Sequence, residues 1–262
     1  MTAHTQASVI GKRAGESGIA FILAFACAGA LAAAEPPRDL ARRVAQRESG
    51  NEAARAHYTY RQTVLVEEID ARGVKAGEYR ETRDVVFLPE KGRTEEILGR
   101  PFNSLQRLRL TEEDFRDVRE VQPFLFTAEQ LWAYQTKYRG EETVDGLLCW
   151  VLDVSPRQLL DGQRLFEGTL WIDPSDYSIV RAHGRAVPQI VRGRTENLFP
   201  RFTTFREKID GRRRFPVHTH ADDVLPFRGG SQRIRLTIRY LNYRRFAAES
   251  SITFEQEQQE KK

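Results

Sequence analysis

The feature that most restricts the fold of this chain is the strict alternation of apolar and polar residues that begins near position 232. Branched or aromatic side chains occupy every second position there, and arginine or threonine occupies the positions between them. The apolar set is Ile234, Leu236, Ile238 and Tyr240, and the polar set is Arg233, Arg235, Thr237 and Arg239. Successive side chains of a strand point to opposite faces of a sheet, so the pattern predicts a strand with one buried and one hydrated face.

Similar segments occur along most of the chain. Near the N-terminus, Tyr58, Tyr60, Val64 and Val66 share one face of a predicted strand, and Glu78 to Leu88 completes a hairpin with Tyr79, Val85 and Phe87 on a common face. The later predicted strands are Leu147–Val154, Leu165–Ile172, Ile179–Ala186, Phe202–Ile209, Phe215–Val224 and Gln232–Phe246. Turn signals such as Asp210-Gly211 separate them, and no helical pattern interrupts them. We therefore expect an antiparallel meander and not a parallel doubly wound sheet.

Three segments have helical character. Residues 39–47 are good helix formers that follow two prolines, and Ser49-Gly50-Asn51 is expected to break or end this helix. Between Arg100 and Tyr138, Thr111 and Thr127 each precede acidic residues, as N-caps do, so we expect short helices there.

The N-terminus reads as a secretory signal. A basic pair precedes a 16-residue apolar run, Ile19–Ala34, which closes on small residues. This run is shorter than the roughly 20 residues that cross a bilayer, and no second run follows. We expect a signal peptide over residues 1–34 with cleavage between Ala34 and Glu35, and no transmembrane segment afterwards. Acylation at Cys27 is the alternative, although bulky Phe25 fits a lipoprotein signal poorly.

The remaining chain is expected to form one domain over residues 35–254, followed by a disordered tail at 255–262 that has no apolar residue. Cleavage would leave Cys149 as the only cysteine, which excludes an internal disulfide. The net charge is +4, but charges of both signs alternate without long blocks, and this pattern disfavours nucleic acid as a partner.

Sequence motifs for catalysis are largely missing. The chain has no phosphate loop, dinucleotide fingerprint, HExxH helix or paired cysteines, so we expect no cofactor and no enzymatic activity. The weak candidate is His218-x-His220-x-Asp222, whose side chains would share one face of a strand and could meet a metal ion. The alternative is that these residues only mark the solvent face, with Val217, Thr219 and Ala221 inside.

Two segments resemble a known family. Gly168–Arg181 reads GTLWIDPSDYSIVR and looks like the strand, tight turn and strand of LolA/LolB-like (RseB-like) periplasmic proteins, which sort outer-membrane lipoproteins. Residues 138–156 are similar to the strand that precedes this hairpin in the family. The resemblance implies an α+β, mainly β fold, in which an N-terminal helix and short inserted helices cover a curved antiparallel sheet, an incomplete barrel. It also implies a periplasmic location.

The family's function implies an apolar hollow that binds acyl chains of lipids or lipoproteins. For ligand-binding candidates we select inner-face positions of several strands: Tyr58, Tyr60, Val85, Phe87, Leu170, Ile172, Ile234 and Leu236. That these side chains only fill a packed core remains open.

Three functions remain open at this stage. The first is non-enzymatic binding of lipid or lipoprotein acyl chains, with a role in outer-membrane lipoprotein sorting. The second is an envelope-stress sensor or interaction module of the same fold, which would engage an envelope membrane protein. The third is a metal-dependent envelope enzyme that uses His218 and His220.

Overall fold

The computed structural model describes residues 36–88, 92–121, 126–159, 164–192 and 195–245, all in the unit formed by residues 35–262. Within these ranges, eleven strands form one antiparallel sheet in the order β3-β2-β1-β13-β12-β11-β8-β7-β6-β5, and β4 pairs with β2. The strands are β1 (Tyr58–Ile69), β2 (Lys75–Leu88), β3 (Gly92–Ile97), β4 (Phe102–Asn103), β5 (Tyr134–Val144), β6 (Leu147–Pro156), β7 (Leu165–Ile172), β8 (Ile179–Val187), β11 (Phe202–Lys208), β12 (Arg214–Leu225) and β13 (Gln232–Arg245). A separate hairpin contains β9 (Ile190–Arg192) and β10 (Thr195–Asn197).

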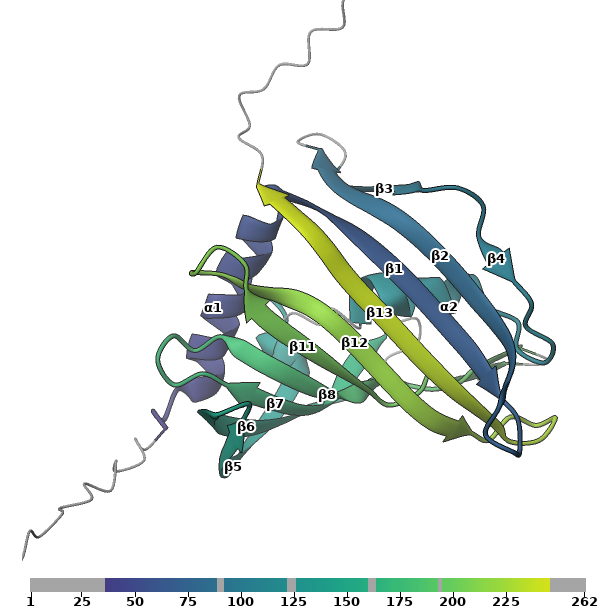
Figure 1. The fold of residues 1–262 in the computed structure, drawn as a ribbon. Helices are drawn as coiled ribbons and strands as arrows, with labels where there is room; N and C mark the ends of the chain where they lie inside the picture. Colours follow the sequence, from purple (N-terminus) through teal and green to yellow (C-terminus); the bar gives the residue numbers. More distant parts are fainter. Residues whose placement is uncertain (1–35, 89–91, 122–125, 160–163, 193–194, 246–262) are drawn as a thin grey trace, which may run out of the picture. The chain divides into compact units, whose positions relative to one another are not determined.

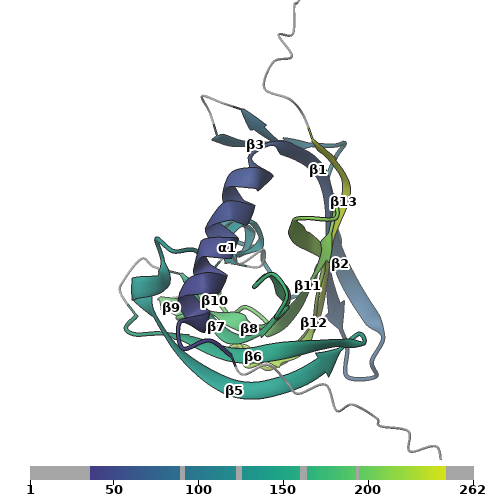
Figure 2. The same ribbon diagram turned by 90° about the vertical axis from the view of Figure 1, so that its left-hand side faces the viewer.

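The sheet is curved and open. Strands β3 and β5 are the two ends of the strand order, and no pairing joins them among the described residues. The sheet bends around helix α1 (Leu40–Arg55), which lies on its concave side (Figures 1 and 2). The predicted fold class, a curved antiparallel sheet covered by an N-terminal helix and short helices, is confirmed.

The predicted alternation of buried and less buried residues is present along β1 and β13. Tyr58, Tyr60, Val64 and Val66 are buried on one face of β1 together with Gln62, and the odd-numbered residues from Thr59 to Leu65 on the other face are half-buried. On β13, the apolar set from Ile234 to Tyr240 is buried in the same way. These faces and the inner faces of β2, β6, β7 and β8 form one hydrophobic core.

The meander is interrupted at two places that the alternation did not predict. After β8 the chain leaves the sheet for the β9–β10 hairpin before it returns as β11. The last strand, β13, pairs with β1, so that Val64 lies opposite Ile238 and the N-terminal hairpin completes the sheet. Strand pairing therefore joins the two ends of the described chain.

Helix α1 is longer than predicted. The expected break at Ser49-Gly50-Asn51 is wrong, because the helix runs through these residues to Arg55. Glu48 and Asn51 are buried on the face of α1 that contacts the sheet, and Asn51 donates a 2.9 Å hydrogen bond to Glu48. Tertiary contacts thus outweigh the poor intrinsic helix propensity of glycine and asparagine.

The region from Arg100 to Tyr138 contains short helices, as predicted. Thr111 caps α2 (Glu112–Arg116) in a capping box, with Asp114 as its reciprocal partner, and a π-helical turn, η1 (Asp117–Val121), follows directly. After Thr127 the helix is reduced to one 3₁₀ turn, η2 (Leu131–Ala133). Strands β3 and β4 were not predicted. No described helix has the length and apolar character needed to cross a membrane.

The hairpin that carries the family resemblance forms as predicted. Strands β7 and β8 pair around the turn at residues 173–178, and Gly168 faces Gly184. A Cβ on Gly168 would lie 2.2 Å from the His183 carbonyl and 2.7 Å from the Phe166 ring, so only glycine fits there. The two glycines leave room for the buried Phe166 ring against the sheet.

Several predictions concern residues outside the described ranges. These are the signal over residues 1–34, the cleavage site between Ala34 and Glu35, the alternative acylation at Cys27, and the tail at 255–262.

Candidate functional site

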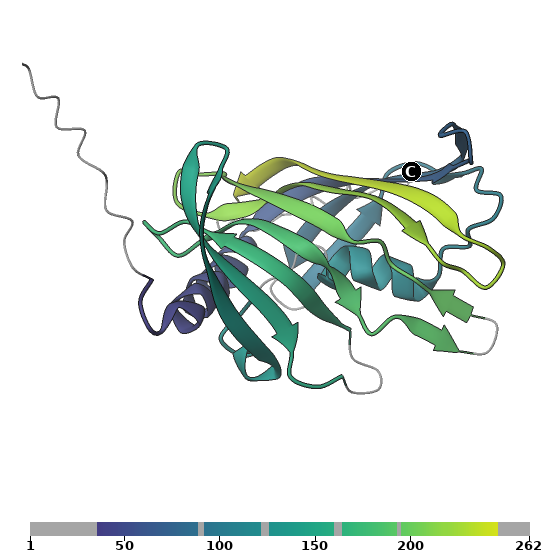
Figure 3. The same ribbon diagram turned by 90° about the horizontal axis from the view of Figure 1, so that it is seen from below.

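A cavity of about 540 Å³ lies on the concave side of the sheet, where β1 and β13 meet the loops that follow β4, β10 and β12. In Figure 3, α2 and the β9–β10 hairpin lie toward the same end of the sheet. The sheet supplies Val66, Gln232, Ile234 and Leu236 to the cavity wall. The remaining lining residues are Arg107, Leu108, Arg109, Leu110, Thr111, Asp114, Glu196, Leu198, Phe199, Pro200, Phe227, Gly229 and Gly230.

The wall opposite the sheet includes an irregular segment, residues 105–111, which we call the strap. A buried carboxylate holds it in place. Glu68 is 1% exposed, and its two carboxylate oxygens accept hydrogen bonds from the successive backbone N–H groups of Gln106, Arg107 and Leu108. Three donors on one carboxylate compensate for its burial and fix the strap against the end of β1.

Close approach of the strap to the sheet depends on Gly77. This residue pairs with Glu68 across β1 and β2. A Cβ on Gly77 would lie 2.5 Å from the carbonyl oxygen of Ser104 and 3.1 Å from both Glu68 Oε2 and Leu105 Cα. A side chain at position 77 would therefore displace the beginning of the strap.

Two polar links join the loops around the cavity. The Arg107 guanidinium donates to the carbonyl oxygens of Gly229 and Gly230, both at 3.3 Å, and of Ser231 at 3.5 Å. The Glu196 carboxylate accepts from the backbone N–H of Arg228 at 3.0 and 3.2 Å, and its oxygen lies 3.8 Å from the Arg228 side chain. The cavity is thus bounded by loops tied through exposed or half-buried contacts, in contrast to the buried anchor at Glu68.

Charged groups of both signs line the cavity beside its apolar walls. Burial raises the pKa of Asp114 from 3.8 to about 6, although hydrogen bonds from the backbone and hydroxyl of Thr111 act in the opposite direction. Arg109 is exposed and, within the described part of the chain, has no hydrogen-bond or ion-pair partner. An apolar chamber with a few polar groups is the usual form of a small-molecule site.

Two of the eight predicted ligand-binding residues, Ile234 and Leu236, line this cavity. The others, which do not line it, are Tyr58, Tyr60, Val85, Phe87, Leu170 and Ile172. Tyr58 packs edge-on against Phe215, with ring centroids 5.0 Å apart, and Val85, Leu170 and Ile172 are fully buried. The six residues contribute to the core, and their contact with a ligand stays a prediction.

Sequence reasoning missed most of the lining residues. Val66 shares the inner face with Val64 and could have been selected on that basis. The strap leucines, Leu108 and Leu110, lie in a segment without strand or helix periodicity. Their contribution depends on how Glu68 places the strap, and no local pattern records that contact.

The weak metal candidates are not assembled into a metal site. Among the described residues, no group of three or more His, Cys, Asp and Glu side chains could hold a metal ion. The Asp222 carboxylate instead accepts hydrogen bonds from Arg233 at 2.7 and 3.0 Å, and the His218 ring stacks on Phe205. Thr219 and Ala221 are buried between the three candidates, as expected for a strand whose other face meets solvent.

A different arrangement fills the concave side at the first residues of β12, where α1 contacts the sheet. Glu48 of α1 and Arg206 of β11 are both fully buried and form a 2.6 Å ion pair. This pair is part of the core between the helix and the sheet, and we call it the buried pair.

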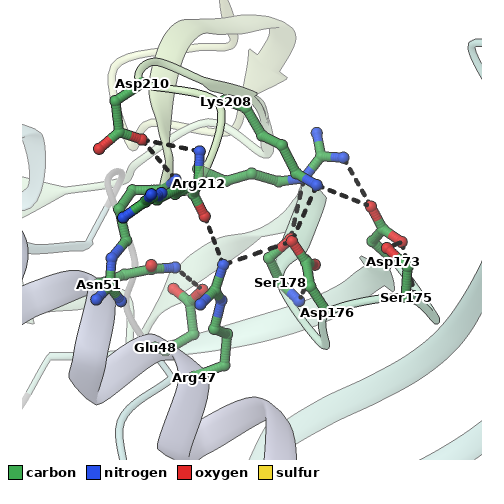
Figure 4. Close-up of polar contacts among 12 residues, drawn as sticks. Arg47, Glu48, Asn51, Asp173, Ser175, Asp176, Ser178, Lys208, Asp210 and Arg212 are labelled. Atoms are coloured by element: carbon green, nitrogen blue, oxygen red, sulfur yellow. Dashed lines mark hydrogen bonds and ion pairs between the residues drawn. The ribbon is translucent and has the colours of Figure 1, made fainter.

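Beside the buried pair, polar contacts tie α1 to two hairpin turns (Figure 4). Arg47 of α1 reaches Asp176 at 3.4 Å and the carbonyl of Arg212, and Lys208 lies 3.1 Å from Asp176. Burial opposes ionisation of Asp176, but hydrogen bonds from Ser178 and Lys208 prevail and lower its pKa. We call these contacts the turn network.

No protein-family model and no curated protein matches the sequence. Solved structures to which the chain is similar include a DUF1329 family protein from Desulfovibrio piger, with 16% identity over 82% of this chain and 95% of that chain and a TM-score of 0.40. They also include a LolA superfamily protein from Nitrosomonas europaea, with 12% identity over 77% and 94% and a TM-score of 0.32. MucB in the MucA/MucB complex of Pseudomonas aeruginosa has 14% identity over 80% and 100% and a TM-score of 0.24.

The family that the sequence resembles is therefore represented among the structures similar to this chain. At these identities and TM-scores they carry no argument about the site, which we derive from this chain's own residues.

Proposed function

We propose that this protein is a non-enzymatic binder of acyl chains, from lipids or lipoproteins, and that the cavity beneath β1 and β13 is the binding site. The observation that carries the proposal is the cavity itself, about 540 Å³ in volume, with valine, isoleucine and leucine side chains on the sheet wall and leucine and phenylalanine side chains from the loops. Packed protein interiors contain few voids larger than a water molecule, whereas ligand sites have about 300–1,000 Å³. Transfer of an acyl chain into such a space is favourable by ~0.8 kcal/mol for each methylene group.

The test measures both native and added ligand. The protein is purified from the cells that naturally produce it and extracted with organic solvent. Mass spectrometry of the extract should detect acyl lipids. A fluorescent fatty acid should bind the delipidated protein with one saturable site. Protein that never carries lipid and does not bind the fluorescent fatty acid would overturn the proposal.

Two tryptophan substitutions separate the cavity from the rest of the surface. Leu110→Trp adds volume at the cavity wall and should weaken fatty-acid binding at least tenfold, a loss of about 1.4 kcal/mol. Leu65→Trp is the matched control, because Leu65 lies on the opposite face of β1 and does not line the cavity. Equal affinities of the two variants would place binding elsewhere.

We further propose export to the periplasm and a role in outer-membrane lipoprotein sorting. The support for export is the basic, apolar and small-residue order of residues 1–34. Cell fractionation should find the protein in the periplasm, and intact mass should correspond to a mature chain that begins at Glu35. A Cys27→Ala variant should leave that mass and location unchanged, whereas membrane release by this variant would support acylation.

A second candidate is an interaction module that engages an envelope membrane protein. One observation favours it: Trp132 and Leu159 are 68% and 51% exposed, near the beginning of edge strand β5 and just beyond the end of β6. Exposed aromatic side chains are common anchors of protein interfaces. Trp132→Ala should reduce recovery of a defined envelope protein in crosslinked pull-downs and leave fatty-acid binding unchanged. Equal recovery of that envelope protein with the parent and with Trp132→Ala would eliminate this candidate.

A further inference from the structure

The acidic and basic side chains that line the cavity differ in whether they have partners within the protein. Among its four charged lining residues, the two acids have nearby donors: Glu196 accepts from the Arg228 backbone, and Asp114 accepts from Thr111. The two arginines, Arg107 and Arg109, come from the strap and are separated by Leu108 alone. Neither has a carboxylate within ion-pair distance in the described part of the chain.

Arg107 contributes its charge without neutralisation, since its three acceptors are uncharged backbone carbonyls at 3.3–3.5 Å. Arg109 contributes both its charge and its unused donors. Arg228 adds a third guanidinium near Glu196, 3.8 Å from that carboxylate. Arg228 and the strap anchor Glu68 both lie outside the lining, so the lining itself has two guanidinium groups and two carboxylates, and both guanidinium groups lie on the strap.

We propose that the cavity selects an anionic amphiphile, with its acyl chain between the apolar walls and its carboxylate or phosphate head at Arg109, with Arg107 beside it. This inference rests on the proposed acyl-binding function and specifies the class of ligand. A guanidinium presents a planar fork of donors that matches the oxygens of either head group in a bidentate arrangement. The adjacent leucines of the strap give the same segment both kinds of contact that an amphiphile requires.

Asp114 and Glu196 are the lining carboxylates that oppose an anion, and the environment of Asp114 limits its opposition. Its carboxylate accepts hydrogen bonds of 2.7 and 2.9 Å from the backbone and hydroxyl of Thr111. Those contacts hold the carboxylate in the capping box at the beginning of α2 and engage it locally. Arg109 has no comparable internal partner among the described residues.

The experiment compares ligands that share one chain length and differ in the head group. Calorimetric titration of the delipidated full chain would use dodecanoate, dodecyl phosphate, dodecanol and dodecyltrimethylammonium, each below its micelle concentration. Both anions should bind roughly tenfold more tightly than dodecanol, as expected for one charge-assisted contact. The preference should diminish as sodium chloride is raised, while dodecanol affinity should not fall.

Arg109→Gln should lower the affinity for both anions about tenfold, to the level of dodecanol, and so remove the preference for anions. The matched control is Arg139→Gln on β5, an exposed arginine that does not line the cavity, and it should retain the preference. Because Arg109 has no hydrogen-bond or ion-pair partner among the described residues, its substitution is not expected to unfold the protein, and circular dichroism checks this.

The outcomes separate the two levels of the proposal. Equal affinity for dodecanoate, dodecyl phosphate and dodecanol, or tighter binding of the cationic amphiphile, overturns the selection of anions and leaves acyl binding intact. Failure of all four ligands to bind overturns the proposed function as well. Tighter binding of the phosphate than of the carboxylate supports a phospholipid head group, and the reverse order supports a free fatty acid.

Discussion

The two ends of strand β12 belong to regions of opposite character. At Arg214, where the strand begins, the concave side is filled by the buried pair and the turn network, which link α1 to two hairpins through directional contacts. At Leu225, where the strand ends, the following loop borders an apolar cavity whose outer walls are irregular segments. The concave side is therefore filled at the charged end, whereas the other end retains a cavity of about 540 Å³.

The two regions are also held in place by different kinds of contact. Glu48 on α1 and Arg206 on β11 are fully buried and pair with each other. Movement of α1 would therefore leave the Arg206 guanidinium buried without its carboxylate. Around the cavity, Arg107 contacts its carbonyl acceptors at the protein surface, where the cost of separation is small. Stability and ligand binding should therefore respond to different substitutions.

The largest effect is expected at the buried pair. Glu48→Ala leaves the buried Arg206 guanidinium without its carboxylate and should lower the free energy of unfolding by about 3–5 kcal/mol. Urea denaturation followed by circular dichroism measures this loss. The double variant with leucine at both positions should recover much of it, since paired apolar replacement removes both charges. A single variant as stable as the parent would show that the pair does not hold α1.

A smaller effect is expected from Gly77→Ala, and it should appear in both the free energy of unfolding and the affinity for fatty acid. The new Cβ would meet the Ser104 carbonyl at 2.5 Å, so the strap must move, at a cost of about 1–3 kcal/mol, and fatty-acid affinity should decrease with it. Gly229→Ala is the control for the loss of stability, because an added Cβ there would meet nothing within 4 Å. Loss of stability without loss of affinity would separate the strap from the binding site.

The third prediction concerns the pH dependence of stability that Asp114, at the cavity, produces. The pKa of Asp114 is raised on folding from 3.8 to about 6, so the folded protein binds more protons than the unfolded chain in this interval. The contribution of Asp114 to stability should therefore decrease as the pH rises from 3.8 to about 6.

The measurement for this prediction is the difference in unfolding free energy between the parent and Asp114→Asn at several pH values. Subtraction removes the effect of other carboxylates such as Asp173 and Asp176, whose lowered pKa values act in the opposite direction. A difference that does not vary with pH over this interval would contradict the prediction.

The smallest effect is expected on the outer face, away from both regions. His220 is exposed on β12, and His220→Ala should change the unfolding free energy by no more than about 0.5 kcal/mol. Plasma emission spectrometry should find the same metal content in both proteins. A stoichiometric metal that His220→Ala removes would revive the metal-dependent enzyme.

The sheet could be predicted because its determinants are local. Alternation identified the buried faces of β1 and β13, and the bounds of Leu165–Ile172 agree with β7. The strand order across β1 and β13 was not accessible in this way, since pairing of Val64 with Ile238 depends on the whole sheet.

The cavity escaped prediction because its placement depends on polar residues at buried positions. Glu68 has the same alternation parity as Val64 and Val66, so its inward position could have been read from the strand, but its three backbone donors come from a segment without periodicity. The continuation of α1 past Gly50 was missed for a related reason. The contact of Glu48 with Arg206 joins positions far apart in the chain, and residue propensities contain no information about it.

Pairing of β1 with β13 has a consequence for the order in which the protein can fold. Strand β1 is among the first parts of the described chain to leave a ribosome or a translocation channel, yet its partner contains almost the last described residues. Until β13 emerges, the β1–β2 hairpin has an open edge, and the site formed by Val66, Ile234 and Leu236 has only one of its two strands. A chain that is released vectorially must therefore wait for its final strand before it can both shield that edge and complete the cavity wall.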